Sequence, residues 1–121
     1  MVADHFLKFP PPPAEPAAGL PAGWTVIAGE PVARGARFYT ADDGTALSGW
    51  WSCTPGSFEV VYDKWEFCHM LSGRCTITPA GKAPVDLGPG DAFILEPGFK
   101  GTWTVHETMT KHFVFKLEPA A

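Results

Sequence analysis

Turn signals recur along this chain at intervals of roughly 8–12 residues, and this spacing constrains the fold more than any other feature. The signals come mostly from glycine and proline, with 13 of each in 121 residues. Asp43-Gly44, Pro55-Gly56, Ala80-Gly81 and Pro97-Gly98 are typical turn dipeptides that separate runs of apolar and β-branched residues. No segment keeps a helical period for more than about two turns. The pattern therefore predicts an all-β domain of short antiparallel strands, folded as a sandwich or a barrel.

The first 22 residues differ from the rest because they are rich in proline and alanine. Pro10–Pro13, Pro16 and Pro21 favour polyproline II structure and cannot donate to a sheet ladder. We expect a Pro-rich N-terminal arm over residues 1–22, either flexible or packed against the body, and one β domain over residues 23–121. A Pro-rich recognition ligand for another protein is the alternative role of the arm.

Charge and cysteine content exclude several classes of protein. The net charge is −4, and no basic run could neutralise a nucleic-acid backbone, so we expect no nucleic-acid partner. No apolar stretch approaches the roughly 18 residues of a membrane span, and the N-terminus lacks the apolar region of a secretory signal. Cys53, Cys68 and Cys75 form no Cys-x-x-Cys pair and are typical of buried, reduced thiols. These features predict a cytoplasmic protein without membrane contact.

Two spaced motifs occupy the centre of the chain. Glu66 is followed by six residues and then Gly73, and later come Gly90-Asp91 and Pro97-Gly98. This arrangement resembles the two motifs of the cupin superfamily, whose fold is a small jelly-roll β-barrel. Over about residues 24–117 the ordered pattern resembles one branch, the cupins related to (S)-ureidoglycine aminohydrolase and to EutQ. The segments that carry this resemblance are 49–51, 55–58, 66–68, 71–73, 90–93, 97–103 and Lys111.

The same resemblance implies a metal site, and most of its ligands are missing. A metal-binding cupin has His-x-His shortly before the glutamate and another histidine in the second motif, and the aminohydrolase relatives hold manganese. Here the first two positions fall on Glu59 and Val61 or on Val60 and Tyr62, depending on the gap. The second-motif position falls on Thr102. Three histidines and a carboxylate would suit a divalent metal, and this set is absent, so we expect no metal cofactor.

A metal site of another composition is the remaining alternative. His106 or His112 would have to join Glu59 or Glu66, and the spacing needed for such a site is not visible in the sequence. His69 has the opposite strand parity from Glu66, so it is expected to point away from the site that Glu66 faces.

Lys111 is the candidate replacement for the metal. It shares a strand face with Phe113 and Phe115, and a face that looks into the barrel would bring its ammonium near the carboxylate of Glu66 or Glu59. A buried carboxylate needs such a partner or must take up a proton. The alternative is an ordinary surface lysine at the start of a strand.

These residues define the candidate site. Glu66 is the candidate general acid or base and Lys111 its electrostatic partner. The candidate ligand-binding residues are Glu59, Trp51, Cys68 and Trp103, with the tryptophans shaping a pocket for a small polar metabolite. The sequence leaves open a metal-independent enzyme, a non-catalytic sensing or auxiliary cupin, and a divalent-metal hydrolase. We also expect a homodimer.

Overall fold

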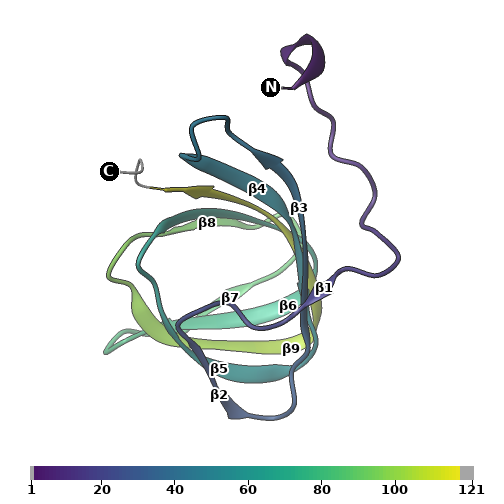
Figure 1. Ribbon diagram of the computed structural model, residues 1–121. Helices are drawn as coiled ribbons and strands as arrows, with labels where there is room; N and C mark the ends of the chain where they lie inside the picture. Colours follow the sequence, from purple (N-terminus) through teal and green to yellow (C-terminus); the bar gives the residue numbers. More distant parts are fainter. Residues whose placement is uncertain (1, 118–121) are drawn as a thin grey trace.

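The computed structural model describes residues 2–117, and its body is almost entirely β structure (Figure 1). The last four residues of the predicted 23–121 domain lie outside the described range. The elements in chain order are the short 3₁₀ turn η1 (Ala3–His5), then β1 (Ala17–Ala18), β2 (Trp24–Ala28), β3 (Ala33–Thr40), β4 (Ala46–Cys53), β5 (Gly56–Val61), β6 (Trp65–Pro79), β7 (Val85–Leu87), β8 (Ala92–Leu95) and β9 (Lys100–Lys116). The all-β prediction is confirmed. Within residues 2–117 there is no helix that could cross a membrane.

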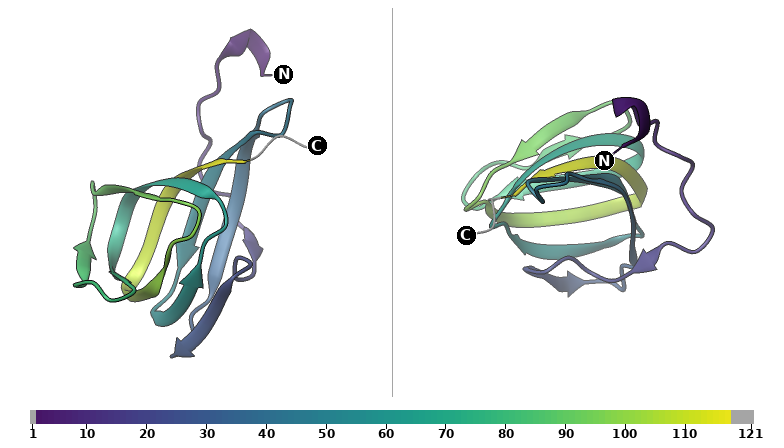
Figure 2. Two further views of the ribbon diagram at one scale, coloured as in Figure 1. Left: turned by 90° about the vertical axis from the view of Figure 1, so that its left-hand side faces the viewer. Right: turned by 45° about the horizontal axis from the view of Figure 1, so that its top comes forward.

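All strand pairs are antiparallel and belong to one sheet, which curls on itself (Figures 1 and 2). Strand β9 is the centre of this sheet. Its first half pairs with β5, its second half pairs with β4, and β6 runs along its other side. Strands β7 and β8 extend the sheet from β6, while β2 extends it from β5 and β3 from β4. Because the sheet is curled, alternate residues of each strand point into a common interior.

Ser72-Gly73 is a dipeptide typical of turns, and the sequence alone predicts a turn there, which the structure shows to be wrong. Strand β6 continues through these residues, and shifts in its pairing register with β9 mark a bulge there. Gly73 has a φ of +80°, and a Cβ at this position would lie 2.2 Å from the carbonyl oxygen of Thr108. The glycine is therefore needed because two long strands approach each other closely here. In the sequence, such a glycine looks the same as a glycine in a turn.

The N-terminal arm is packed against the body. Strand β1 pairs with the edge of β3, where Ala17 lies opposite Gly35. Further along the arm, the ring of Phe9 lies 5.1 Å from that of Phe38 and 5.0 Å from that of His112, measured between centroids. Of the two alternatives, the described residues of the arm fit the packed one. The domain boundary after residue 22 stays a prediction.

Four aromatic side chains form a layer across the interior, here called the aromatic layer: Trp24, Trp51, Phe58 and Trp103. The ring of Trp24 lies 5.0–5.5 Å from the other three, and the rings of Trp51 and Trp103 are 6.0 Å apart. All four residues are buried. Such edge and tilted contacts are the favoured geometry of aromatic pairs. The layer fills the middle of the barrel and determines where cavities remain.

Candidate functional site

Four polar side chains meet in the interior, here called the buried polar cluster: Tyr62, Glu66, Cys68 and Lys111. Glu66 and Cys68 are two residues apart on β6, so both point inward. Lys111 comes from the adjacent strand β9, opposite Met70, and Tyr62 follows directly after β5. Glu66 is 1% exposed and Lys111 2% exposed. The strand parity expected from the sequence for Glu66 and Lys111 is therefore confirmed.

Hydrogen bonds join the four side chains into one continuous network. The Lys111 Nζ donates to Glu66 Oε2 at 3.0 Å and to Cys68 Sγ at 3.3 Å. The other carboxylate oxygen of Glu66, Oε1, accepts the hydroxyl of Tyr62 at 2.5 Å. Both oxygens of the buried carboxylate thus have a donor, and one of the donors carries the opposite charge. The ion pair between Lys111 and Glu66 that the sequence suggested is present.

Two rings of the aromatic layer enclose the ammonium group. The Lys111 Nζ lies 4.9 Å from the ring centroid of Trp51 and 4.9 Å from that of Trp103. Cations are attracted to the faces of aromatic rings within about 6 Å, and the attraction grows when water is absent. The ammonium is therefore held by two acceptors and two rings, and the residue is almost completely buried.

The surroundings fix the charge states of the cluster. Burial acts to lower the pKa of Lys111, but its acceptors Cys68 and Glu66 outweigh burial and raise the pKa above the ordinary value of 10.5. Burial raises the pKa of the Cys68 thiol to about 12, and burial together with Glu66 raises the pKa of Tyr62 well above its usual value. At neutral pH the cluster holds one ammonium, a neutral thiol and a neutral phenol.

The residues at this centre do not fit a divalent metal. Val60 and Tyr62, not Glu59 and Val61, occupy the interior positions of the first motif. In the second motif the interior position belongs to Trp103, whereas Thr102 alternates outward, which corrects the expected alignment. Among residues 2–117 no group of three or more His, Cys, Asp or Glu is arranged to hold a metal. The Lys111 ammonium already neutralises the carboxylate.

The histidine alternative fails on geometry as well. His112 is on the outer side of β9, opposite His69 of β6, as the parity argument for His69 requires. His106 is exposed, and its Nε2 lies 2.7 Å from the hydroxyl of Thr76. Neither ring approaches Glu66, so no set of ligands forms around that carboxylate.

Glu59 is not part of the cluster, which corrects its assignment to the ligand site. It is exposed on the outer side of β5, between Thr25 of β2 and Thr102 of β9. Trp51 and Cys68 do lie in the interior. Trp103 is there too, and it is fully buried. Its indole N–H has no hydrogen-bond partner among the described residues.

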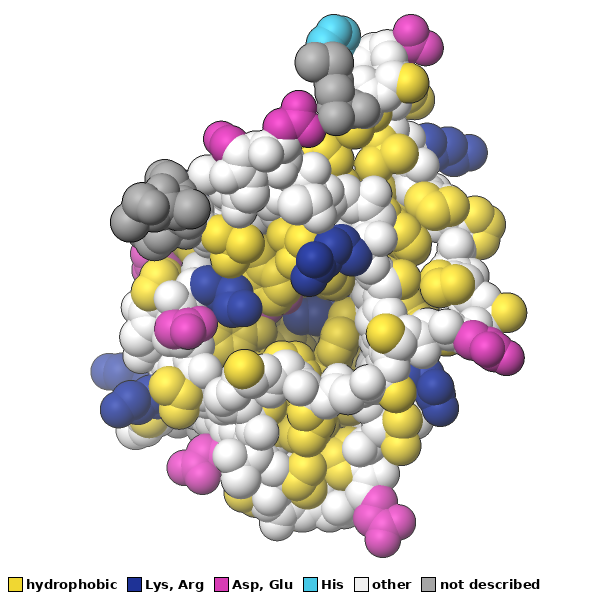
Figure 3. Space-filling view, viewed as in Figure 1, with side chains coloured by type: hydrophobic (Ala, Val, Ile, Leu, Met, Phe, Trp, Pro, Cys, Tyr) yellow, Lys and Arg dark blue, Asp and Glu magenta, His cyan; other side chains and the backbone are white. Residues whose placement is uncertain are grey.

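A hollow of about 640 Å³ opens at one end of the barrel, here called the barrel mouth. Its walls include Leu47, Trp51, Phe113 and Phe115, together with residues 17–21 of the arm. Figure 3 faces this end and shows hydrophobic side chains in the hollow and basic side chains near its opening. Trp51 connects the barrel mouth with the buried polar cluster, because its ring lines the mouth and also contacts the Lys111 ammonium.

Two basic residues stand at the barrel mouth that the sequence did not single out. Arg37 belongs to the lining and points inward from β3, where it lies opposite Gly49. The Lys64 Nζ lies 4.8 Å from the ring centroid of Phe115. Arg37 shares the inward parity of Ala33 and Gly35, but the sequence does not show which face of β3 looks into the barrel. The sequence pointed to Tyr62 only as one of the positions where metal-binding cupins have a histidine.

Comparison with solved structures supports the fold. EutQ from Clostridium difficile superposes with a TM-score of 0.64 at 16% identity, over 72% of this chain and 69% of that protein. A DUF861-family protein from Pseudomonas syringae gives 0.68 at 18% identity, over 83% of this chain and 42% of the other. Ectoine synthase from P. lautus gives 0.63 at 18% identity, over 69% and 63%. These similarities show a cupin fold.

Comparison at the level of sequence gives the family. No curated protein matches the chain. The model of the EutQ-like cupin domain matches residues 40–113, which include β4 to β8 and the whole of the buried polar cluster. Since the match spans more than half of the chain, this protein belongs to the family of EutQ-like cupins.

Proposed function

We propose that this cupin binds a small organic anion with an apolar body in the barrel mouth. The observation that carries the proposal is the combination of an aromatic hollow of about 640 Å³ with Arg37 as the charged residue of its lining. Pockets for small molecules are commonly apolar with a few placed polar groups. A carboxylate ligand would lie with its body against Trp51 and Phe113 and its charge beside Arg37, with Lys64 adding to the positive field.

In this proposal Glu66 and Lys111 are positioning residues. Both are sealed beneath the aromatic layer and already paired, so a ligand in the barrel mouth meets Trp51 and not the ammonium. Lys111 holds the ring of Trp51 in place through the cation–π contact. Acid–base catalysis by Glu66 and Lys111 is the alternative role, and it requires the ring of Trp51 or Trp103 to move aside.

The test is an NMR titration with benzoate at low ionic strength, observing the indole N–H of Trp51. We expect this signal to shift with benzoate, and to shift much less with benzylammonium. Replacing Arg37 by Gln should weaken benzoate binding by about two- to fivefold, the range for one exposed charge pair. Arg34→Gln is the matched control, because Arg34 is an exposed arginine of the same strand that faces outward, opposite Ser52.

Two results would contradict the proposal. Benzoate that leaves the Trp51 indole unchanged at millimolar concentration would remove the barrel mouth as the binding site. Equal losses of affinity in Arg37→Gln and Arg34→Gln would show a general effect of net charge. A change in the NMR signals of the Lys111 side chain upon benzoate addition would instead favour direct contact between benzoate and the buried polar cluster.

We further propose that the protein forms a homodimer through the outer face of β8, β6 and β9. Ile94, Phe67 and Val114 lie side by side on this face, and Ile94 is 52% exposed. A continuous apolar row on one face suits an isologous contact between two copies. Light scattering during size-exclusion chromatography at micromolar concentration tests it, and a single species of 13.0 kDa would contradict a stable dimer.

A further inference from the structure

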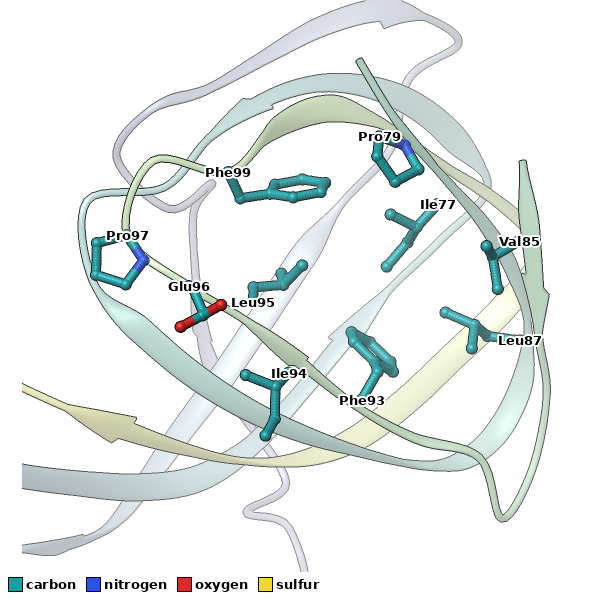
Figure 4. A pocket seen from close by; sticks show the side chains of 10 residues that line it. All are labelled: Ile77, Pro79, Val85, Leu87, Phe93, Ile94, Leu95, Glu96, Pro97 and Phe99. Atoms are coloured by element: carbon teal, nitrogen blue, oxygen red, sulfur yellow. The ribbon is translucent and has the colours of Figure 1, made fainter. Parts of the chain in front are cut away.

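A second hollow, of about 490 Å³, lies between the last part of β6, the strands β7 and β8, and the loop before β9 (Figure 4). It is here called the β7–β8 hollow. The side chains of Ile77, Leu87, Phe93, Leu95 and Phe99 converge on it. None of its lining residues belongs to the barrel mouth.

The interior aromatics separate the two hollows. The ring of Phe93 lies 5.8 Å from that of Trp103, and the ring of Phe99 lies 6.3 Å from that of Tyr62. Trp103 in turn contacts Trp51, which lines the barrel mouth. A molecule in the β7–β8 hollow would therefore rest on the opposite side of the aromatic layer and would not compete with a ligand of the barrel mouth.

One charged group belongs to the lining of this hollow, and it is a carboxylate. Glu96 follows the last residue of β8, and its backbone carbonyl accepts the N–H of Phe99 at 3.1 Å. That bond closes a turn at Pro97-Gly98 and places the Glu96 side chain at one end of the hollow (Figure 4). Within residues 2–117 the structure gives this carboxylate no hydrogen bond or ion pair, and no lysine or arginine lines the hollow.

We propose that the β7–β8 hollow binds a small apolar or aromatic molecule that carries an ammonium group, with the ammonium beside Glu96. The apolar body would replace water on Phe93, Leu95 and Ile77, which is the favourable part of binding. The ammonium would pair with the free carboxylate, and the ring of Phe99 offers a further attraction for a cation. This site is independent of the proposed anion site and has the opposite charge preference.

The isoleucines of the chain provide the readout. They are Ile27, Ile77 and Ile94. Ile77 points into the hollow, Ile94 borders it from the outer face of β8, and Ile27 is on β2. A protein with labelled isoleucine δ-methyl groups would be titrated with benzylammonium, benzoate and benzyl alcohol. We expect benzylammonium to shift the methyl signal of Ile77 and to leave that of Ile27 unchanged. Benzoate should act on the Trp51 indole instead.

A pair of matched variants tests the role of the carboxylate. Glu96→Gln should weaken benzylammonium binding by roughly two- to fivefold, as expected for one solvent-accessible charge pair, and should leave benzyl alcohol binding unchanged. Glu59→Gln removes the same charge from the outer side of β5 and should have no such effect. Both residues are exposed, so neither variant is expected to unfold the domain.

The proposal is overturned if benzylammonium does not shift Ile77 at millimolar concentration, or if all three probes shift it equally. It is also overturned if Glu59→Gln weakens binding as much as Glu96→Gln. Because Trp51 and Ile77 report on different hollows, failure of this site and failure of the anion site are seen separately in one titration.

Discussion

Strands β6 and β9 carry two polar groupings that are one residue apart in sequence and lie on opposite faces of the sheet. Glu66, Cys68 and Lys111 face the interior, whereas His69 and His112 lie opposite each other on the outside. The inner pair, Glu66 and Lys111, is almost completely buried and joins unlike charges. The outer pair joins two like groups that remain partly exposed, and the pKa of His112 is lowered by burial and by His69.

The difference shows what each environment tolerates. Where water is excluded, an ionised carboxylate persists only with a cation and hydrogen-bond donors beside it, because an unpaired buried charge is very costly. On the outer face water screens the two imidazoles, so two like groups lie side by side at little cost. The inner grouping should therefore dominate stability, and the outer one should matter only for the response to pH.

The largest effect is expected from Lys111→Met, which breaks the inner pair and leaves Glu66 without its cation. The free energy of unfolding should fall by about 3–5 kcal/mol, the usual cost of an orphaned buried charge. Denaturant unfolding measures this. Lys116→Met, which removes an exposed lysine of the same strand, should change the stability by less than about 0.5 kcal/mol.

A double variant shows whether the loss comes from the charge left behind. In Glu66→Gln with Lys111→Met neither ion remains, so the double variant should lose much less stability than the sum of the two single variants. It should also recover folding if Lys111→Met alone does not fold. Additive losses would show that the inner pair is not coupled and would contradict the comparison.

Tyr62→Phe should have the next largest effect, because it removes the second hydrogen-bond donor of the Glu66 carboxylate. A bond to a charged group contributes about 1.5–3 kcal/mol, and the stability should fall by that amount in thermal or denaturant unfolding. Tyr39→Phe is the matched control, on the less buried strand β3. Equal losses in the two variants would indicate that the bond from Tyr62 to Glu66 contributes no more than the hydroxyl of a less buried tyrosine.

Thiol chemistry tests whether the interior is sealed. Burial raises the pKa of Cys68 to about 12, that of Cys53 to about 12 and that of Cys75 to about 11, so almost no thiolate is present at pH 8. Iodoacetamide should leave all three unmodified in the folded protein while it alkylates them fully in urea, as followed by mass spectrometry. Rapid modification of Cys68 in the folded state would reveal opening of the aromatic layer.

The smallest effect concerns the outer histidines. The unfolded chain protonates His112 near its ordinary pKa of 6.5, whereas the folded chain does so only at lower pH. Protons therefore favour the unfolded state, and the contribution of His112 to stability is present above pH 6.5 and declines as the pH falls below it. Stability measured between pH 5 and 8 should show this slope, and His112→Gln should reduce it.

A control separates His112 from the other histidines. His106→Gln alters an exposed side chain that contacts Thr76, away from the outer pair, and should leave the slope unchanged. A slope that survives in His112→Gln would assign the pH response to another group.

The sequence by itself determined the features that depend on local pattern. The spacing of Gly and Pro predicted an all-β chain, and the two motifs predicted the cupin fold and its branch, both of which are confirmed. Two-residue periodicity also put Glu66 and His69 on opposite faces of one strand, and Lys111 on the same face as Phe113 and Phe115. These predictions hold because alternation along a strand is a property of the backbone and needs no knowledge of distant partners.

Only the tertiary structure decided which strands lie side by side and in which register. Glu59 was placed in the site because the gap before Glu66 could be counted in two ways, and the pairing of β5 with β9 places it outside. Gly73 appeared to end a strand until the close approach of Thr108 explained it. The two hollows and their opposite charges, Arg37 in one and Glu96 in the other, arise from segments distant in sequence. Register between distant strands depends on how the whole sheet closes and packs, which no local pattern encodes.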